Sequence, residues 1–211
     1  MKAFGYSSVI ALLLAGLISS GMAAAATATR IVARVTPFAA DGSLRGGLRV
    51  AARGTGTCEP GSDALSSAVY RCFYSNRVLD PCWRDHRRAN PVVVVCLLTP
   101  WAKSVVQLTL SANPGSTTGT STTRGEPWGI ELATGQHCIA LQGAHDTVNH
   151  RGGGVPIDYS CGGTLVLLRG VDRSSSTWTI RAARTRSTQP DVIVGSRTIK
   201  VAWFGGNSPR S

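Results

Sequence analysis

The segment PVVVVCLL, residues 91–98, decides the fold class of this chain. Every residue after the proline is apolar, so an extended segment here would be buried on both faces, which is typical of a central strand. SVVQLTL, residues 104–110, alternates apolar and polar side chains and is the expected partner of that strand. The two segments together predict a sheet.

Outward from this pair, β-branched and alternating segments recur along the whole chain, separated by glycine-rich turns. Thr134-Gly135 between two such segments is typical of a hairpin turn. The pattern predicts an all-β fold, a compact antiparallel sandwich or barrel-like domain stapled by disulfides. Further strands are expected at residues 30–35, 48–52, 69–74, 128–133, 136–141, 157–161, 165–169, 177–183 and 192–204.

The N-terminus has the layout of a cleavable secretory signal. Met1-Lys2 is followed by an apolar run, VIALLLAGLI at residues 9–18, and then by the small residues 23–26. An uncleaved anchor is the alternative, although no charged stop follows the run. We expect a signal peptide at residues 1–26, a secreted single domain at 27–211, and no transmembrane segment after cleavage.

All six cysteines lie in the predicted mature part, and an even number in an exported chain is typical of disulfides. Six cysteines allow 15 pairings. Nearest-neighbour spacing favours Cys58–Cys72, Cys82–Cys96 and Cys138–Cys161, and each bond would add roughly 3 kcal/mol of stability. There is no CxxC motif and no histidine at zinc-ligand spacing, so we expect no metal and no cofactor.

The formal net charge is +11, and the cations are nearly all arginine. Such a charge attracts acidic partners, here an acidic cell-envelope polymer or another exported protein. The arginines are scattered along the chain, as is typical of a solvated surface. No basic stripe with interleaved aromatics is visible, so nucleic acid is not an expected partner.

Residues 111–126, SANPGSTTGTSTTRGE, contain no apolar side chain large enough to pack and are expected to form a mobile surface loop. Residues 145–156, HDTVNHRGGGVP, are also polar and rich in glycine and are expected to form an exposed loop tip. Its His145, Asp146 and His150 are candidate binding residues, and a solvated tip is the alternative.

Five tryptophans are many for a chain with 6% aromatic residues. Trp83 and Trp203 lie in apolar segments and are expected in the core. Trp101 and Trp128 each follow a proline at the start of a strand, so they are the candidates for exposed rings that stack on sugars or contact a protein.

The sequence carries no specific signature of a cysteine, serine or paired-carboxylate enzyme. A cysteine nucleophile near Ser160-Cys161-Gly162 would need a free thiolate, and six paired cysteines leave none. No Gly-x-Ser-x-Gly turn marks a serine nucleophile. The acidic residues available for paired-carboxylate chemistry in the second half are Glu126, Glu131, Asp146 and Asp158. Glu131 lies between two apolar residues of a predicted strand and should point outward.

Several short motifs resemble a group of exported actinobacterial proteins with paired cysteines and no assigned activity. The resemblance runs from about Cys58 to Phe204 and implies export and disulfide pairing, but no catalytic residue. The motifs are Arg71-Cys72-Phe73, NRVLDPCW at 76–83, Val94-Val95-Cys96, Pro100-Trp101, PWGIELATG at 127–135, Tyr159-Ser160-Cys161 and Trp178-Thr179-Ile180.

From these observations we expect a secreted, non-enzymatic binding protein that acts at the cell envelope or outside the cell, because a stapled sheet without a recognisable active site favours recognition. The alternative hypothesis is a cell-envelope hydrolase or transpeptidase that uses a histidine or cysteine of residues 145–161.

Overall fold

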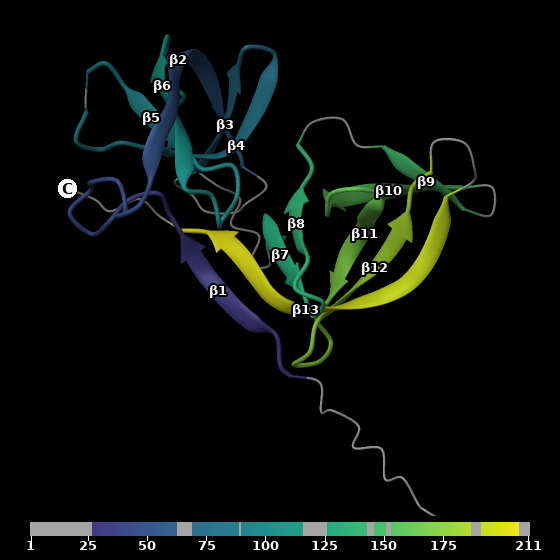
Figure 1. The fold of residues 1–211 in the computed structure, drawn as a ribbon. Helices are drawn as coiled ribbons and strands as arrows, with labels where there is room; N and C mark the ends of the chain where they lie inside the picture. The colour runs from purple at the N-terminus through teal and green to yellow at the C-terminus, as the bar shows by residue number, and fades with distance from the viewer. Residues whose placement is uncertain are drawn as a thin grey trace, which may run out of the picture.

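The computed structural model describes residues 27–62, 69–88, 90–115, 126–142, 146–150, 153–186 and 191–206. These residues form thirteen strands and no helix, so the predicted all-β class is confirmed. The signal-peptide prediction, most of the predicted loop at 111–126 and His145 lie outside the described residues. Figure 1 shows the strands as two bodies joined along β1 and β13.

The first body, which we call the first barrel, is a closed barrel of five consecutive strands. Neighbouring strands are antiparallel, and because their number is odd, the pair that closes the ring, β2 with β6, is parallel. The strands are β2 (Arg49–Pro60), β3 (Val69–Tyr74), β4 (Arg77–Arg84), β5 (Val93–Cys96) and β6 (Ser104–Leu110).

The second body, the second sheet, has the strand order β1-β13-β12-β11-β10-β8-β7, with β9 paired to β10. Strand β7 also pairs with the C-terminal half of β13, so the path of strands returns on itself. The strands are β1 (Arg30–Val35), β7 (Gly129–Leu132), β8 (His137–Ala140), β9 (Thr147–His150), β10 (Gly153–Ser160), β11 (Leu165–Asp172), β12 (Thr179–Arg184) and β13 (Val192–Gly205).

All three cysteine pairs have the partners that nearest-neighbour spacing favoured. Cys58 lies opposite Cys72 in the β2–β3 ladder, and Cys82 lies opposite Cys96 in the β4–β5 ladder. Cys138 and Cys161 continue the pairing of β8 with β10. Each bond therefore joins neighbouring strands of one sheet.

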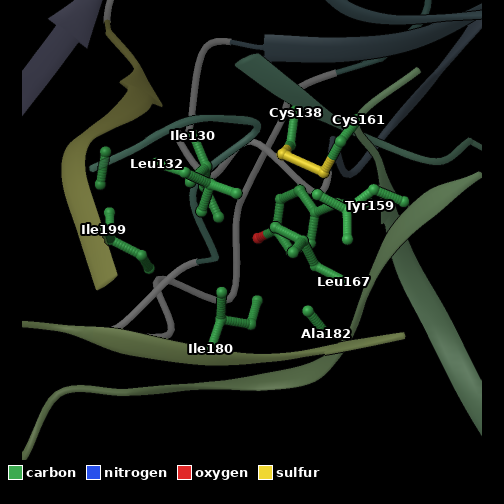
Figure 2. Close-up of a cluster of buried hydrophobic side chains, with 11 residues drawn as sticks. Ile130, Leu132, Cys138, Tyr159, Cys161, Leu167, Ile180, Ala182 and Ile199 are labelled. Atoms are coloured by element: carbon green, nitrogen blue, oxygen red, sulfur yellow. A yellow bond between two sulfur atoms is a disulfide. The ribbon is translucent and has the colours of Figure 1, made fainter. Parts of the chain in front are cut away.

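The first barrel has one buried cluster of its own and the second sheet has two, and a further cluster joins the two bodies. The second sheet encloses aliphatic side chains around Tyr159 and the Cys138–Cys161 bond (Figure 2). The shared cluster combines Trp83, Val95 and Val105 of the first barrel with Trp128, beside β7, and with the half-buried Trp203 of β13. The prediction of a single domain stays a prediction.

Strand β2 continues to Pro60, beyond its predicted end at residue 52. Gly54 and Gly56 lie close to the neighbouring strand β3: a Cβ on Gly54 would overlap the Tyr74 ring, and one on Gly56 would lie 2.6 Å from the Phe73 carbonyl oxygen. These glycines allow close approach inside a strand instead of ending it.

The segment 145–156, predicted as a solvated polar tip, instead contributes two paired strand segments. Strand β9 pairs with the first part of β10, and Val148 is fully buried with Ile157 and Leu168. Val148 and Val155 lie opposite each other in this ladder, and such cross-strand pairs stabilise a hairpin despite the glycines around them.

Candidate functional site

Trp101 lies on the turn between β5 and β6, at the junction of the two bodies. The turn is closed by a hydrogen bond from the Ala102 amide to the Thr99 carbonyl at 3.1 Å. The indole of Trp101 stacks on the imidazole of His137 in β8, with ring centroids 4.3 Å apart and planes 14° from parallel. A ring from the first barrel thus packs flat against a strand of the second sheet.

Trp203 of β13 completes the arrangement, which we call the Trp101 cluster: Trp101, His137 and Trp203. The Trp203 ring meets Trp101 edge to face at 5.4 Å and His137 edge to face at 5.8 Å. Gly129 makes room for the Pro100-Trp101 turn, because a Cβ on residue 129 would lie 2.5 Å from the Pro100 ring and 3.1 Å from the Trp101 ring. Edge-to-face and stacked rings are the favoured aromatic geometries.

Charged groups border the Trp101 cluster on the side of β7. The Glu131 carboxylate receives a 2.8 Å hydrogen bond from the Lys200 ammonium and lies 4.0 Å from His137 Nε2. The Glu131 side chain is 16% exposed, whereas those of His137 and Lys200 are 42% and 57% exposed. The carboxylate is therefore held in place, while the imidazole and the ammonium face solvent.

This arrangement offers the elements with which proteins bind sugars and similar ligands: half-buried indole rings beside an exposed imidazole, a fixed carboxylate that accepts hydrogen bonds and an ammonium that donates them. The strands hold the groups, since Glu131 and His137 lie opposite each other in the β7–β8 ladder. Preorganised side chains lose little conformational entropy on binding.

The expectation that Trp128 is exposed is wrong. Its side chain is 1% exposed, and its ring meets the fully buried Trp83 edge to face at 6.2 Å. The Trp128 amide donates to the Trp203 carbonyl at 2.9 Å, which fixes this residue at the start of β7 with its ring in the shared cluster. Trp83 is confirmed as a core residue, and Trp203 is half-buried.

The candidate residues of the second tip do not join the Trp101 cluster in any described contact. Asp146 is exposed, and its carbonyl accepts a 3.0 Å hydrogen bond from the Ile157 amide. His150 ends β9, and only its backbone is described. The binding role of these residues stays a prediction.

Cys161 is bonded to Cys138, so it is not the free thiol that cysteine catalysis requires. The sulfurs of Cys72, Cys82 and Cys96 lie within 4.8 Å of one another, a spacing that suits a metal ion. Each of them is occupied in a disulfide, however, so this group is two neighbouring disulfides in the barrel interior.

A second charged group surrounds Arg173 at the end of β11. Its guanidinium lies over the rings of Trp178 and Phe204, at 4.9 and 5.7 Å from their centroids, and 3.3 Å from the Glu126 carboxylate. Burial raises the pKa of Glu126, and the charge of Asp158 adds to the rise, whereas Arg173 opposes it. Arg173 therefore links Glu126, before β7, to Trp178, directly before β12, and to Phe204 of β13.

Sequence reasoning missed His137 and Trp203 as site residues. The signal for His137 was present, because a hairpin centred on Thr134-Gly135 places residue 137 opposite the outward-pointing Glu131. No sequence signal brings Trp101 to Trp203, since the two residues are 102 positions apart and meet only through the junction of the two bodies.

Within the part of the chain that is described, no helix has the length and apolar character that a membrane crossing requires. Comparisons of the chain with protein families, with curated proteins and with solved structures give no match in any of the three.

Proposed function

We propose that this is a secreted recognition protein that binds glycan at the cell envelope through the Trp101 cluster. The observation that carries the proposal is the stack of the half-buried Trp101 on the exposed His137, with the Glu131–Lys200 pair at its border. Sugar rings present apolar faces that pack on aromatic rings and hydroxyls that exchange hydrogen bonds with charged groups. The three disulfides suit the oxidising conditions outside the cell.

The test is co-sedimentation of the purified protein with isolated cell wall. Trp101→Ala and His137→Ala should each weaken binding by about tenfold, which is the loss expected for one well-packed aromatic contact of about 1.4 kcal/mol. Trp101→Phe keeps a stacking ring and should restore most of the affinity.

Phe73→Ala is the matched control, because Phe73 is the one described aromatic side chain among the exposed large hydrophobic residues and lies away from the junction, on β3. Unchanged binding of Trp101→Ala, with the same melting temperature as the parent, would contradict the proposal. Equal loss in Phe73→Ala would show non-specific apolar adsorption instead.

A further inference from the structure

Four of the six cysteines form a row across neighbouring strands of the first barrel. Cys58 of β2 lies opposite Cys72 of β3, and Cys82 of β4 lies opposite Cys96 of β5. All four lie in or against the buried cluster of the barrel interior. We call them the cysteine row. Its two disulfides join β2 to β3 and β4 to β5, so the row contains no bond between β3 and β4.

The two disulfides of the cysteine row lie close to each other. The sulfur of Cys72 is within 4.8 Å of the sulfurs of both Cys82 and Cys96. The Cys82 sulfur is also 3.2 Å from the carbonyl oxygen of Leu79, the residue that lies opposite Cys72 in the β3–β4 ladder. Cys72 and Cys82 are therefore neighbours on adjacent strands, and a rotation of the Cys72 side chain brings their sulfurs together once Cys72 is released from Cys58.

Thiol–disulfide exchange can move the bond between these neighbours. A thiolate attacks one sulfur of a disulfide, forms a new bond with it and releases the other sulfur as a thiolate. A free Cys72 thiolate that attacks Cys82 forms the Cys72–Cys82 bond and releases Cys96. Attack on Cys96 would instead join β3 to β5, whose backbones are roughly 8–10 Å apart, and a disulfide spans at most about 7 Å between Cα atoms. The exchange therefore has one product.

Cys58 is the member of the cysteine row that a thiol from solvent can reach. It is half-buried and lies two residues before the end of β2, whereas Cys72, Cys82 and Cys96 are fully buried. Exchange depends on access to the attacked sulfur, so an external thiol reacts at Cys58 first. The attack forms a mixed disulfide on Cys58 and releases Cys72 as the thiolate.

We infer that the cysteine row is a thiol-exchange site, which accepts a low-molecular-weight thiol on Cys58, moves the internal bond to Cys72–Cys82 and leaves the free thiol on Cys96. Two disulfides and one thiol react, and two disulfides and one thiol result, so no oxidant or reductant is consumed. The internal bonds then join β3 to β4 in place of the two outer strand pairs. The inference is independent of the proposed glycan binding, because the cysteine row shares no residue with the Trp101 cluster.

The experiment treats the parent protein with an equimolar amount of reduced glutathione, then quenches with acid, alkylates the free thiols and maps the peptides. Glutathione should be found on Cys58, a peptide pair joined by Cys72–Cys82 should appear, and Cys96 should be alkylated. After hours, the timescale of uncatalysed disulfide rearrangement, Cys96 should carry about a tenth or more of the alkylated thiol of the first barrel. Alkylation confined to Cys72 would overturn the inference, and so would the absence of glutathione from Cys58.

Cys58→Ser removes the external thiol from the experiment, because it leaves the Cys72 thiol beside the Cys82–Cys96 bond. Part of that thiol should move to Cys96, and faster at higher pH, since the thiolate is the attacking species. Cys138→Ser is the matched control: it leaves one thiol in the second sheet, which should stay on Cys161. Equal migration in both variants would show exchange between molecules and contradict the inference.

A pair of double variants tests the same geometry through stability. Cys58→Ser with Cys96→Ser leaves Cys72 and Cys82, which should join on oxidation in air. Cys58→Ser with Cys82→Ser removes as many cysteines but leaves Cys72 and Cys96, on strands too far apart to join. The first variant should therefore unfold at a higher urea concentration than the second. Equal midpoints, or a Cys72–Cys96 bond in the second variant, would overturn the inference.

Discussion

The first barrel and the second sheet keep their strands together by different means. The first barrel has two disulfides side by side in its interior, and it buries the carboxylates of Asp80, within β4, and of Asp85, directly after β4. The second sheet has one disulfide and a larger set of buried aliphatic side chains around Tyr159. Covalent bonds thus compensate where a short five-stranded ring has little room for an apolar core.

The buried carboxylates of the first barrel are paired, as buried charges must be. Ser62 donates to Asp80, and Arg71 lies 3.4 Å from it. Asp85 is bordered by Arg87 at 3.3 Å and Arg88 at 3.7 Å. The second sheet has no fully buried carboxylate among its described residues, so its core depends on packing.

The largest effect should come from separating the two bodies. Trp83→Ala removes a fully buried indole that contacts Trp128 across the junction and whose N–H donates to the Gly206 carbonyl. The loss should be about 3–5 kcal/mol in the free energy of unfolding. Calorimetry should then show the two bodies unfolding in transitions that are further apart in temperature than in the parent. A single transition in Trp83→Ala would show that the bodies do not depend on this contact.

Removing one bond of the first barrel should come next. Cys82→Ala with Cys96→Ala should lower stability by about 3 kcal/mol, since the bond closes a loop across 14 residues. Hydrogen exchange should show the loss in β4 and β5 and leave the second sheet protected. Faster exchange in β10 and β11 to the same degree would mean that the two bodies share one unfolding unit.

The glycines of β2 give a smaller test of close packing in the first barrel. Gly54→Ala should lower stability by about 1–3 kcal/mol, because its new methyl group would overlap the Tyr74 ring. Gly46→Ala is the control, since nothing lies within 4 Å of the new atom there, and its unfolding midpoint in urea should be unchanged or slightly higher. Tyr74→Leu in the Gly54→Ala background should recover part of the loss.

The smallest effect concerns the pH dependence of the second sheet. Burial raises the pKa of Glu126, so the folded protein binds this proton more tightly than the unfolded chain does. The resulting stability is present below the ordinary carboxyl pKa and is lost as pH rises through the raised value. Urea unfolding should therefore show Glu126→Gln gaining stability relative to the parent between pH 4 and pH 7.

Asp172 is the control, because its pKa is shifted in the opposite direction to that of Glu126. The Ser174 amide donates to its carboxylate and lowers its pKa, so this contribution is present at neutral pH and is lost as pH falls. Asp172→Asn should consequently gain stability relative to the parent as pH falls. The same pH trend in both variants would contradict the assignment of burial as the dominant cause for Glu126.

The sequence was informative where the signal is local. Residues 93–96 form a fully buried strand paired with residues 104–110, as their apolar and alternating patterns predict. The cysteine pairs and the Thr134-Gly135 turn follow from spacing and turn chemistry in the same way. Segments whose pairing depends on neighbours were missed, among them β4, with Pro81 inside it, and β9.

The site could be predicted only in part, because exposure is a tertiary property. Trp101 and Trp128 occupy the same local context, a proline followed by tryptophan at the start of a strand. The Trp101 ring is half-buried in the Trp101 cluster, and the Trp128 ring is fully buried in the shared core. The difference arises from the packing of the two bodies, which no local pattern records.

The five indole N–H signals of the protein offer the most direct test of the account. Two-dimensional NMR during a titration with soluble peptidoglycan fragments, with each signal assigned by a Trp→Phe variant, reports on every tryptophan at once. Glycan binding at the Trp101 cluster should shift the signals of Trp101 and Trp203 and leave those of the buried Trp83 and Trp128 and of Trp178 unchanged. Shifts confined to Trp178, or no shift at Trp101 at saturating ligand, would contradict it.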